Sequence, residues 1–191
     1  MKPDLDAAAR ALREFLAAVG APLGDPELQE TPQRVAHAFV EELLDGYRVD
    51  PAALLAEALP SAETGLVAVR GLSFASMCPH HLMPSVGVAD IAYLPGGRLV
   101  GVGVIARLLD AYARRLVLQE TLGQQVADAL VRHLGARAAG VVLDAQHACL
   151  SARGERQARA RVRTHAFAGD WGHDLSARAE FFAATASMEG R

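Results

Sequence analysis

The stretch "LVAVRGLSFASMCPHHLMPSVGVADIAYLP", residues 66–95, decides the fold class. Its two flanks, residues 66–77 and 86–95, are rich in β-branched residues and alternate between apolar and small or polar side chains. A period of two is typical of half-buried strands. The "PGG" at residues 95–97 predicts a further hairpin, in which the second strand turns back into "RLVGVG", residues 98–103. We therefore predict an antiparallel sheet that begins here.

Helices are predicted upstream of this sheet. Residues 4–19 carry apolar side chains on one face and end at a glycine, which predicts an amphipathic helix. A second helix is predicted with Thr31 as its N-cap and Pro32 at its first position, where the missing amide proton costs nothing. A short third helix is predicted after Asp50-Pro51.

The remaining chain completes an α+β pattern. Residues 60–64 are predicted to form a linker, which divides a helical region, residues 1–62, from a second domain, residues 63–191. After the first strands come, in order, two helices over residues 104–118 and 121–134, two strands within residues 139–152 and 156–169, and a helical tail from residue 176. The order β-β-α-α-β-β predicts an antiparallel sheet with helices on one face.

Composition excludes several classes of protein. With 191 residues, 51% of them hydrophobic, the chain is long enough for one well-buried core and is too apolar to be disordered. A net charge of −3 gives no case for binding nucleic acid or a membrane, and no apolar run is long enough for a membrane span. The acidic, amphipathic N-terminus is not that of a signal peptide. Because two cysteines are too few for a disulfide framework, we expect reduced thiols and a cytoplasmic location.

Both cysteines stand beside histidines. Cys78 and His81 have a C-x-x-H spacing that lets one turn present a thiolate and an imidazole to the same point, and Cys149 could supply a third ligand from a later strand. Zinc accepts this donor set in tetrahedral geometry, and three protein ligands with an open fourth position is the catalytic pattern. The alternative is that each cysteine is simply buried in the core.

Four stretches resemble one known family, GTP cyclohydrolase I. They are "ETPQRVAHAFVEELLDGY" (30–47), "FASMCPHHLMPSVGVADIAYLP" (74–95), "VIARLLDAYARRLVLQETLGQQVADAL" (104–130) and "DAQHACLSARGE" (144–155). The resemblance implies the T-fold, in which N-terminal helices precede the β-β-α-α-β-β unit, and a toroidal homodecamer with active sites at subunit interfaces. It also implies hydrolysis of the guanine imidazole ring of GTP, which releases formate and gives 7,8-dihydroneopterin triphosphate, the first step of pterin and folate biosynthesis.

The same resemblance implies roles for individual residues. The zinc ligands fall on Cys78, His81 and Cys149, and the acid–base histidines on His80 and His147. Histidine suits this role because its ordinary pKa of about 6.5 lets it take and give protons near neutrality. The alternative for His80 is a residue that only orients the turn, and for His147 a strand side chain packed beside the metal.

Substrate contacts are implied as well. Gln119 and Glu120 match the family's guanine-recognition pair, in which a carboxylate accepts two parallel hydrogen bonds from guanine N1–H and N2–H₂. Arg107, Arg153 and Arg34 match arginines that hold the triphosphate. Without the resemblance, Glu120 would be interpreted as a helix-start glutamate and each arginine as a solvated surface residue.

The sequence departs from the family at three places. Pro79 replaces the usual glutamate, which is not a metal ligand. Gly103 and Val104 stand where the family carries a serine, implicated in the later ribose rearrangement, and a lysine that contacts phosphate. The last strand is usually rich in serine and threonine. Here alternating arginines are predicted on one face of it, where they compensate for the lysine, pair with a neighbouring subunit or are solvated: Arg159, Arg161 and Arg163.

Three hypotheses remain at this point. The first is a zinc-dependent GTP cyclohydrolase I. The second, motivated by Gly103 and Val104, is a relative that acts on another purine nucleotide or stops at the ring-opened formamidopyrimidine. The third is a non-catalytic purine- or pterin-binding paralogue, and the open metal position argues against it because a binding module has no need of one.

Overall fold

The computed structural model describes residues 3–185, which divide into two compact units, Met1–Asp45 and Gly46–Arg191. The elements are α1 (Leu5–Ala18), α2 (Thr31–Ala38), α3 (Pro51–Ala56), β1 (Leu59–Pro60), β2 (Val67–Met77), β3 (Pro84–Leu94), β4 (Arg98–Leu99), α4 (Val102–Ala113), α5 (Gln119–Ala129), β5 (Ala138–His147), α6 (Ala148–Ser151), β6 (Val162–Gly169), α7 (Asp170–His173) and α8 (Arg178–Thr185). Within residues 3–185 no helix has the length and apolar character needed to cross a bilayer.

The first unit contains α1 and α2, which pack against each other. The helix predicted over residues 4–19 is confirmed over Leu5–Ala18, with the Asp4 carboxylate accepting a hydrogen bond from the Ala7 amide at its start. The predicted N-cap of α2 is wrong by one residue. Glu30 occupies that position, and the Thr31 hydroxyl bonds the Glu27 carbonyl instead of an amide of the first turn.

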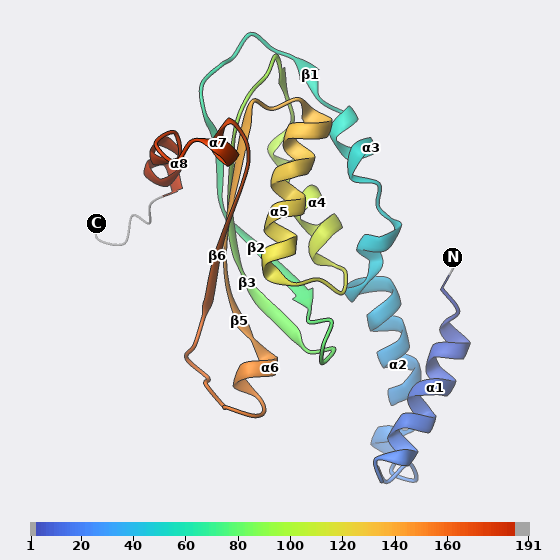
Figure 1. Cartoon of the computed structure of the whole chain (residues 1–191). Coiled ribbons are helices and arrows are strands. Elements are labelled where there is room, and N and C mark those ends of the chain that lie inside the picture. Colours follow the sequence, from blue (N-terminus) through green and yellow to red (C-terminus); the bar gives the residue numbers. More distant parts are fainter. Residues whose placement is uncertain (1–2, 186–191) are drawn as a thin grey trace. The chain divides into compact units, whose positions relative to one another are not determined.

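The second unit is organised by a four-stranded antiparallel sheet in the order β2-β3-β5-β6 (Figure 1). Long strands of β-branched, alternating sequence meet at its centre, where β3 pairs with β2 on one side and with β5 on the other. The register places Ser85 of β3 opposite Ser76 of β2 and opposite His147 of β5. Three polar residues therefore lie side by side at one end of the sheet.

Helices α4 and α5 cover one face of the sheet, as predicted (Figure 1). The main core lies between these helices and alternate residues of β3 and β5, among them Ile91 and Val141. The opposite face carries α7 and α8, whose Trp171 and Phe181 pack over Val142 in a second, smaller core (Figure 1). The predicted helical tail therefore closes the side of the sheet that α4 and α5 leave open.

Helix α4 is shorter than predicted because Arg115 ends it. The Arg115 guanidinium bonds the carbonyl groups of Ala111 and Gly46 and lies 5.1 Å from the centre of the Tyr112 ring. The chain beyond it leaves the helix, and the Val117 amide donates to the carbonyl of Met77 at the end of β2. This extended segment delivers the start of α5 to the end of the sheet that carries the polar residues.

The predicted hairpin through residues 95–97 is wrong. Strand β4 pairs with β1, not with β3, in a separate two-stranded sheet. The physical reason is that β3 already has β2 on one edge and β5 on the other, so no edge remains for β4. The residues predicted as a linker, 60–64, accordingly begin inside β1.

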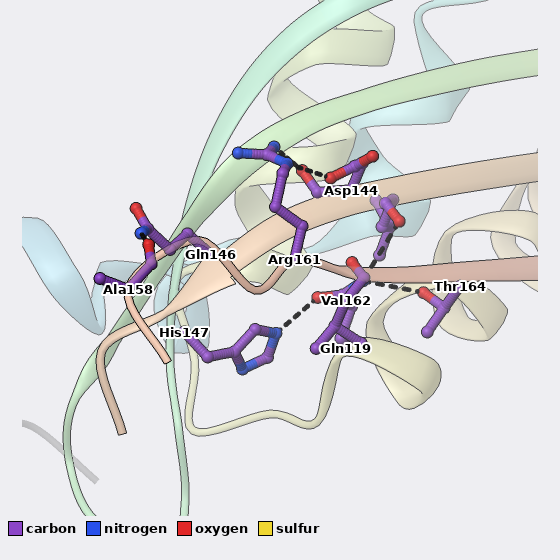
Figure 2. Close-up of polar contacts among 9 residues, drawn as sticks. Gln119, Asp144, Gln146, His147, Ala158, Arg161, Val162 and Thr164 are labelled. Carbon is purple, nitrogen blue, oxygen red and sulfur yellow. Dashed lines mark hydrogen bonds and ion pairs between the residues drawn. The ribbon is translucent and has the colours of Figure 1, made fainter. Parts of the chain in front are cut away.

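The predicted row of arginines on the last strand is also wrong. Strand β6 begins at Val162, so only Arg163 lies on it, and Arg159 and Arg161 belong to the segment before it. Arg161 binds Asp144 of β5, with 2.5 Å between Nε and Oδ1 (Figure 2). That contact replaces the alternation that the sequence suggested.

The boundary between compact units does not coincide with the predicted domain boundary at residues 62 and 63. Helix α3 precedes that point, yet Leu55 on it is fully buried in the main core of the second unit. The compact units divide between residues 45 and 46 instead. The functional division into residues 1–62 and 63–191 stays a prediction.

Gly87 is required where β3 and β5 approach each other most closely. A Cβ at this position would stand 2.2 Å from the Asp144 carbonyl oxygen and 2.6 Å from the Ala145 Cα, and neither backbone atom can move aside alone. Overpacking costs about 1–3 kcal/mol, and we expect Gly87→Ala near the upper limit, a fall in Tm of roughly 6–12 °C. Thermal unfolding measures this. Gly65→Ala is the control, because its Cβ meets nothing within 4 Å, and equal Tm values for the two variants would contradict the prediction.

Candidate active site

A tight turn between β2 and β3 brings Cys78 and His81 together. The Cys78 amide donates to the Met83 carbonyl and the Leu82 amide to the Cys78 carbonyl, each at 2.9 Å, and Leu82 takes a positive φ of 51° to close the loop. The Cys78 Sγ then lies 3.8 Å from the His81 Nδ1. Cys149 arrives from α6, directly after β5, because β5 pairs with β3 up to His147.

These three side chains fit a metal ion. Their ligand atoms lie within 4.8 Å of one another. Around a tetrahedral ion with metal–sulfur bonds of about 2.3 Å and metal–nitrogen bonds of about 2.0 Å, ligand atoms stand roughly 3.3–3.8 Å apart. Small movements of exposed side chains therefore suffice, and the set of Cys78, His81 and Cys149 predicted from sequence meets at one point as a possible metal site.

The Cys149 thiol has a raised pKa without a metal. Burial is the main cause, the neighbouring Cys78 adds to it, and the positive charge of Arg153 opposes both. A cation bound between the sulfurs reverses this preference, since a coordinating thiol loses its proton outright. The electrostatics of the empty cluster are those of a site completed by a cation.

A cavity of about 200 Å³ opens beside the cluster. It is lined by Ser76, Cys78, Pro79, His80, Ser85, Val117, Leu118, Gln119, Glu120, His147, Cys149 and Val162. Six of the ten residues predicted as site residues thus share one hollow at the end of the sheet, between the β2–β3 turn, the start of α5 and the end of β5. His80 lies on its rim, with its ring centre 6.1 Å from that of His81.

His147 is held by hydrogen bonds at both ring nitrogens. Its Nε2 lies 2.8 Å from Oε1 of Gln119 (Figure 2), and its Nδ1 lies 3.0 Å from the Ser85 hydroxyl. Gln119 is itself buried, and its Nε2 donates to the carbonyl groups of Leu143 and Val162 and to the hydroxyl of Thr164. The imidazole is thus tied to the first residue of α5 and, through it, to two strands.

Burial lowers the pKa of His147, and the negative charge of Glu120 opposes this shift. The neutral ring is therefore favoured near neutral pH. A neutral imidazole carries one N–H and one lone pair, so it can either give or accept a proton without first being recharged. Glu120, exposed at the start of α5, has a free carboxylate at the cavity.

The arginines are placed less uniformly. Arg153 follows α6 and is near enough to Cys149 to affect its pKa, but it is exposed and does not line the cavity. Arg107 on α4 forms an ion pair with Glu57 at 2.7 Å. Arg34 belongs to the first unit, where it pairs with Glu30 at 2.6 Å. None of the three lines the cavity, and their roles toward a phosphate stay predictions.

The first turn of α4 offers neither the hydroxyl nor the ammonium that the family carries. A Cβ on Gly103 would meet nothing within 4 Å, so the position is open, whereas Val104 is 5% exposed and belongs to the main core. The departure seen in the sequence is therefore a real gap in the polar groups of this turn.

Sequence reasoning missed Ser85 and Thr164. Ser85 shares a strand face with Ala89, Ile91 and Tyr93, all of which are in the main core. A serine at a core-facing position of an alternating strand needs a buried partner, and this was the available signal. Thr164 could not have been found in this way because its partner, Gln119, comes from a helix that is distant in sequence.

Comparison with known proteins agrees with this geometry. The family model for GTP cyclohydrolase I matches residues 8–186. A relative from Corynebacterium glutamicum is 42% identical over 94% of this chain and 92% of its own length, one from Leifsonia xyli subsp. xyli is 45% identical over 91% of each, and one from Chromobacterium violaceum is 41% identical over 94% and 88%. All three are named GTP cyclohydrolase 1.

Among solved structures, the apo form of an archaeosine synthase QueF-Like matches 56% of this chain at 17% identity with a TM-score of 0.46, a likeness too weak to support an argument. The family model and the curated relatives, in contrast, cover nearly the whole chain, and the metal-binding cluster of Cys78, His81 and Cys149 lies within the matched region. The chain belongs to the GTP cyclohydrolase I family.

Proposed function

We propose that this protein is an enzyme that opens the imidazole ring of GTP, releases formate and forms 7,8-dihydroneopterin triphosphate. The observation that carries the proposal is the meeting of a three-ligand metal cluster with a cavity that also contains a free carboxylate and two histidines. A module that only binds a purine would need the carboxylate but not the cluster. The reduced thiols favour a cytoplasmic enzyme.

Zinc is the ion that the cluster suits best. Two thiolates and one imidazole are soft to borderline donors, and three protein ligands leave a fourth position open. When bound, zinc supplies an activated water for attack on C8 of the purine. The protein's own part is to hold the ligands on two strand ends that are fixed by the pairing of β3 with β5.

Glu120 is proposed to select guanine. Its carboxylate at the cavity can accept hydrogen bonds from N1–H and N2–H₂ together, a pair of donors that adenine lacks. The buried amide of Gln119 has both donor hydrogens engaged within the protein, so we assign direct recognition chiefly to Glu120. Gln119 contributes through the hold it has on His147.

His80 and His147 are proposed to move protons. Both line the cavity, from opposite sides of the cluster in the sequence, and His147 is the more firmly held of the two. As C8 becomes tetrahedral, a ring nitrogen of the purine must be protonated, and a neutral imidazole with one N–H at the cavity can supply that proton.

The triphosphate is proposed to lie outside the cavity. Pockets that enclose a drug-sized ligand have volumes of about 300–1,000 Å³, and this one, at about 200 Å³, accommodates a base rather than a whole nucleotide. Arg153 beside Cys149 is the nearest of the three candidate cations, and Arg107 and Arg34 are proposed to join it. A ring-shaped homo-oligomer, with a neighbouring copy completing the phosphate site, is part of the same proposal.

A second candidate is a truncated reaction that ends at the ring-opened formamidopyrimidine or at formate. The open position at Gly103 and the buried Val104 favour it, because the first turn of α4 has no hydroxyl for the ribose rearrangement and no ammonium for phosphate. Ring opening needs neither group, so the two outcomes separate after the first chemical step.

The test is an assay of zinc-loaded protein with GTP. Formate is measured enzymatically and the pterin by its fluorescence after oxidation. We expect both products in equal amounts, while formate or a formylated intermediate without pterin supports the truncated reaction. Comparing GTP, GDP and GMP separates a change in phosphate preference from a change in chemistry. Neither formate nor a ring-opened product from protein with confirmed zinc would overturn the proposal.

A further inference from the structure

A buried serine touches the imidazole on the side away from Gln119. Ser85 is only 3% exposed, and its register partner across the β3–β5 pair is His147. Its Oγ lies 3.0 Å from the His147 Nδ1. A buried hydroxyl must find a partner, and here the partner is a ring proposed to take part in the reaction.

The direction of each hydrogen bond follows from Gln119. Its Nε2 contacts three oxygen acceptors, those of Leu143, Val162 and Thr164, so the other end of the amide is the oxygen. An oxygen accepts, which requires the proton of the neutral imidazole to be on the His147 Nε2, 2.8 Å away. The Nδ1 then holds a lone pair, and the Ser85 hydroxyl must be the donor to it.

We infer that Ser85 is a positioning residue for His147, which fixes the imidazole in one orientation and in the tautomer that carries its proton on Nε2. Two strands and one helix supply the contacts: Ser85 from β3, His147 from β5 and Gln119 from α5. The kinetic consequence rests on the proposed function, whereas the tautomer itself does not.

Loss of the hydroxyl would leave Nδ1 as a buried acceptor without a donor. The ring could then rotate or move its proton to Nδ1, and the N–H would no longer be on the nitrogen that Gln119 holds at the cavity. Gln119 could not follow, since turning its amide would aim an amide oxygen at the carbonyl oxygens of Leu143 and Val162. Ser85 is thus the one adjustable contact of the imidazole among the described residues.

The kinetic test compares Ser85→Ala with the wild-type enzyme under zinc-saturated conditions. Partners that orient a site residue typically change activity by about 10–100-fold, and we expect kcat to fall by that factor while KM and zinc content stay unchanged. Ser85→Thr, which keeps a hydroxyl, restores most of kcat. Thr185→Val is the control, because it removes an equally buried hydroxyl from α8 without touching the site.

A second readout does not need activity. In protein labelled with ¹⁵N-histidine, the His147 ring nitrogens, assigned by their loss in His147→Gln, have widely separated shifts in a single tautomer and converging shifts when tautomers exchange. We expect wide separation in the wild type and Thr185→Val, and convergence in Ser85→Ala. Unchanged shifts in Ser85→Ala overturn the inference, as does an unchanged kcat. Wild-type protein without formate release overturns the proposed function instead and leaves the tautomer result standing.

Discussion

Cys149→Ser protein is expected to retain little zinc after dialysis and to release formate at less than about one hundredth of the wild-type rate. Loss of a residue that merely orients a ligand costs about 10–100-fold in metal affinity or activity, so loss of a ligand itself should cost more. Serine preserves the size of the side chain, but a hydroxyl keeps its proton near neutral pH and is a poor replacement for a thiolate. Only two other ligands would then remain, Cys78 and His81.

The measurement is metal content by atomic emission together with formate release before and after zinc is added back. Ser151→Ala is the control because it changes another residue of the same short helix, α6, outside the cluster. Wild-type protein stripped by a chelator should regain activity with zinc, and Cys149→Ser should not. Full zinc content and an undiminished rate in Cys149→Ser would remove the basis for the metal centre.

Glu120→Gln is expected to lower kcat/KM for GTP roughly a hundredfold, because hydrogen bonds to a charged partner are worth about 1.5–3 kcal/mol. The amide can accept only one of guanine's two hydrogen bonds, and its own NH₂ would oppose the other donor. Inosine triphosphate, which lacks the 2-amino group, should lose less. The preference for GTP over inosine triphosphate should therefore narrow.

Steady-state kinetics with both nucleotides decides this. Glu63→Gln serves as the matched control, since Glu63 is an exposed glutamate outside the cavity. A variant that keeps the wild-type preference between the two nucleotides would show that Glu120 does not bind the base, even if its rate fell. Guanine selection would then have to come from groups other than the carboxylate at the start of α5.

Local patterns in the sequence predicted what depends on neighbouring residues. The C-x-x-H spacing of Cys78 and His81 lies within one turn, and the turn brings the two side chains together. The strands of the sheet and their order followed from alternation and from the resemblance, and the structure confirms them. Cys149 could be placed at the same metal only through that resemblance, because nothing local links it to Cys78.

Contacts between distant segments could not be predicted. The pairing of β4 with β1 depends on which edges β3 has left free, a property of the whole sheet. Arg161 was expected on a strand and instead binds Asp144, because β6 starts only at Val162. The bond between Ser85 and His147 depends on the register of two strands that lie 62 residues apart in the chain.

Gln119 limits how this protein can evolve. Its amide joins the start of α5 to the backbones of β5 and β6 and also holds the imidazole. A side chain that both donates and accepts at this length is an amide, so replacement by glutamate or leucine would disturb the architecture and the chemistry in a single mutational step. Descendants of this gene can therefore acquire new substrates more readily by altering Glu120 than by altering the residue beside it.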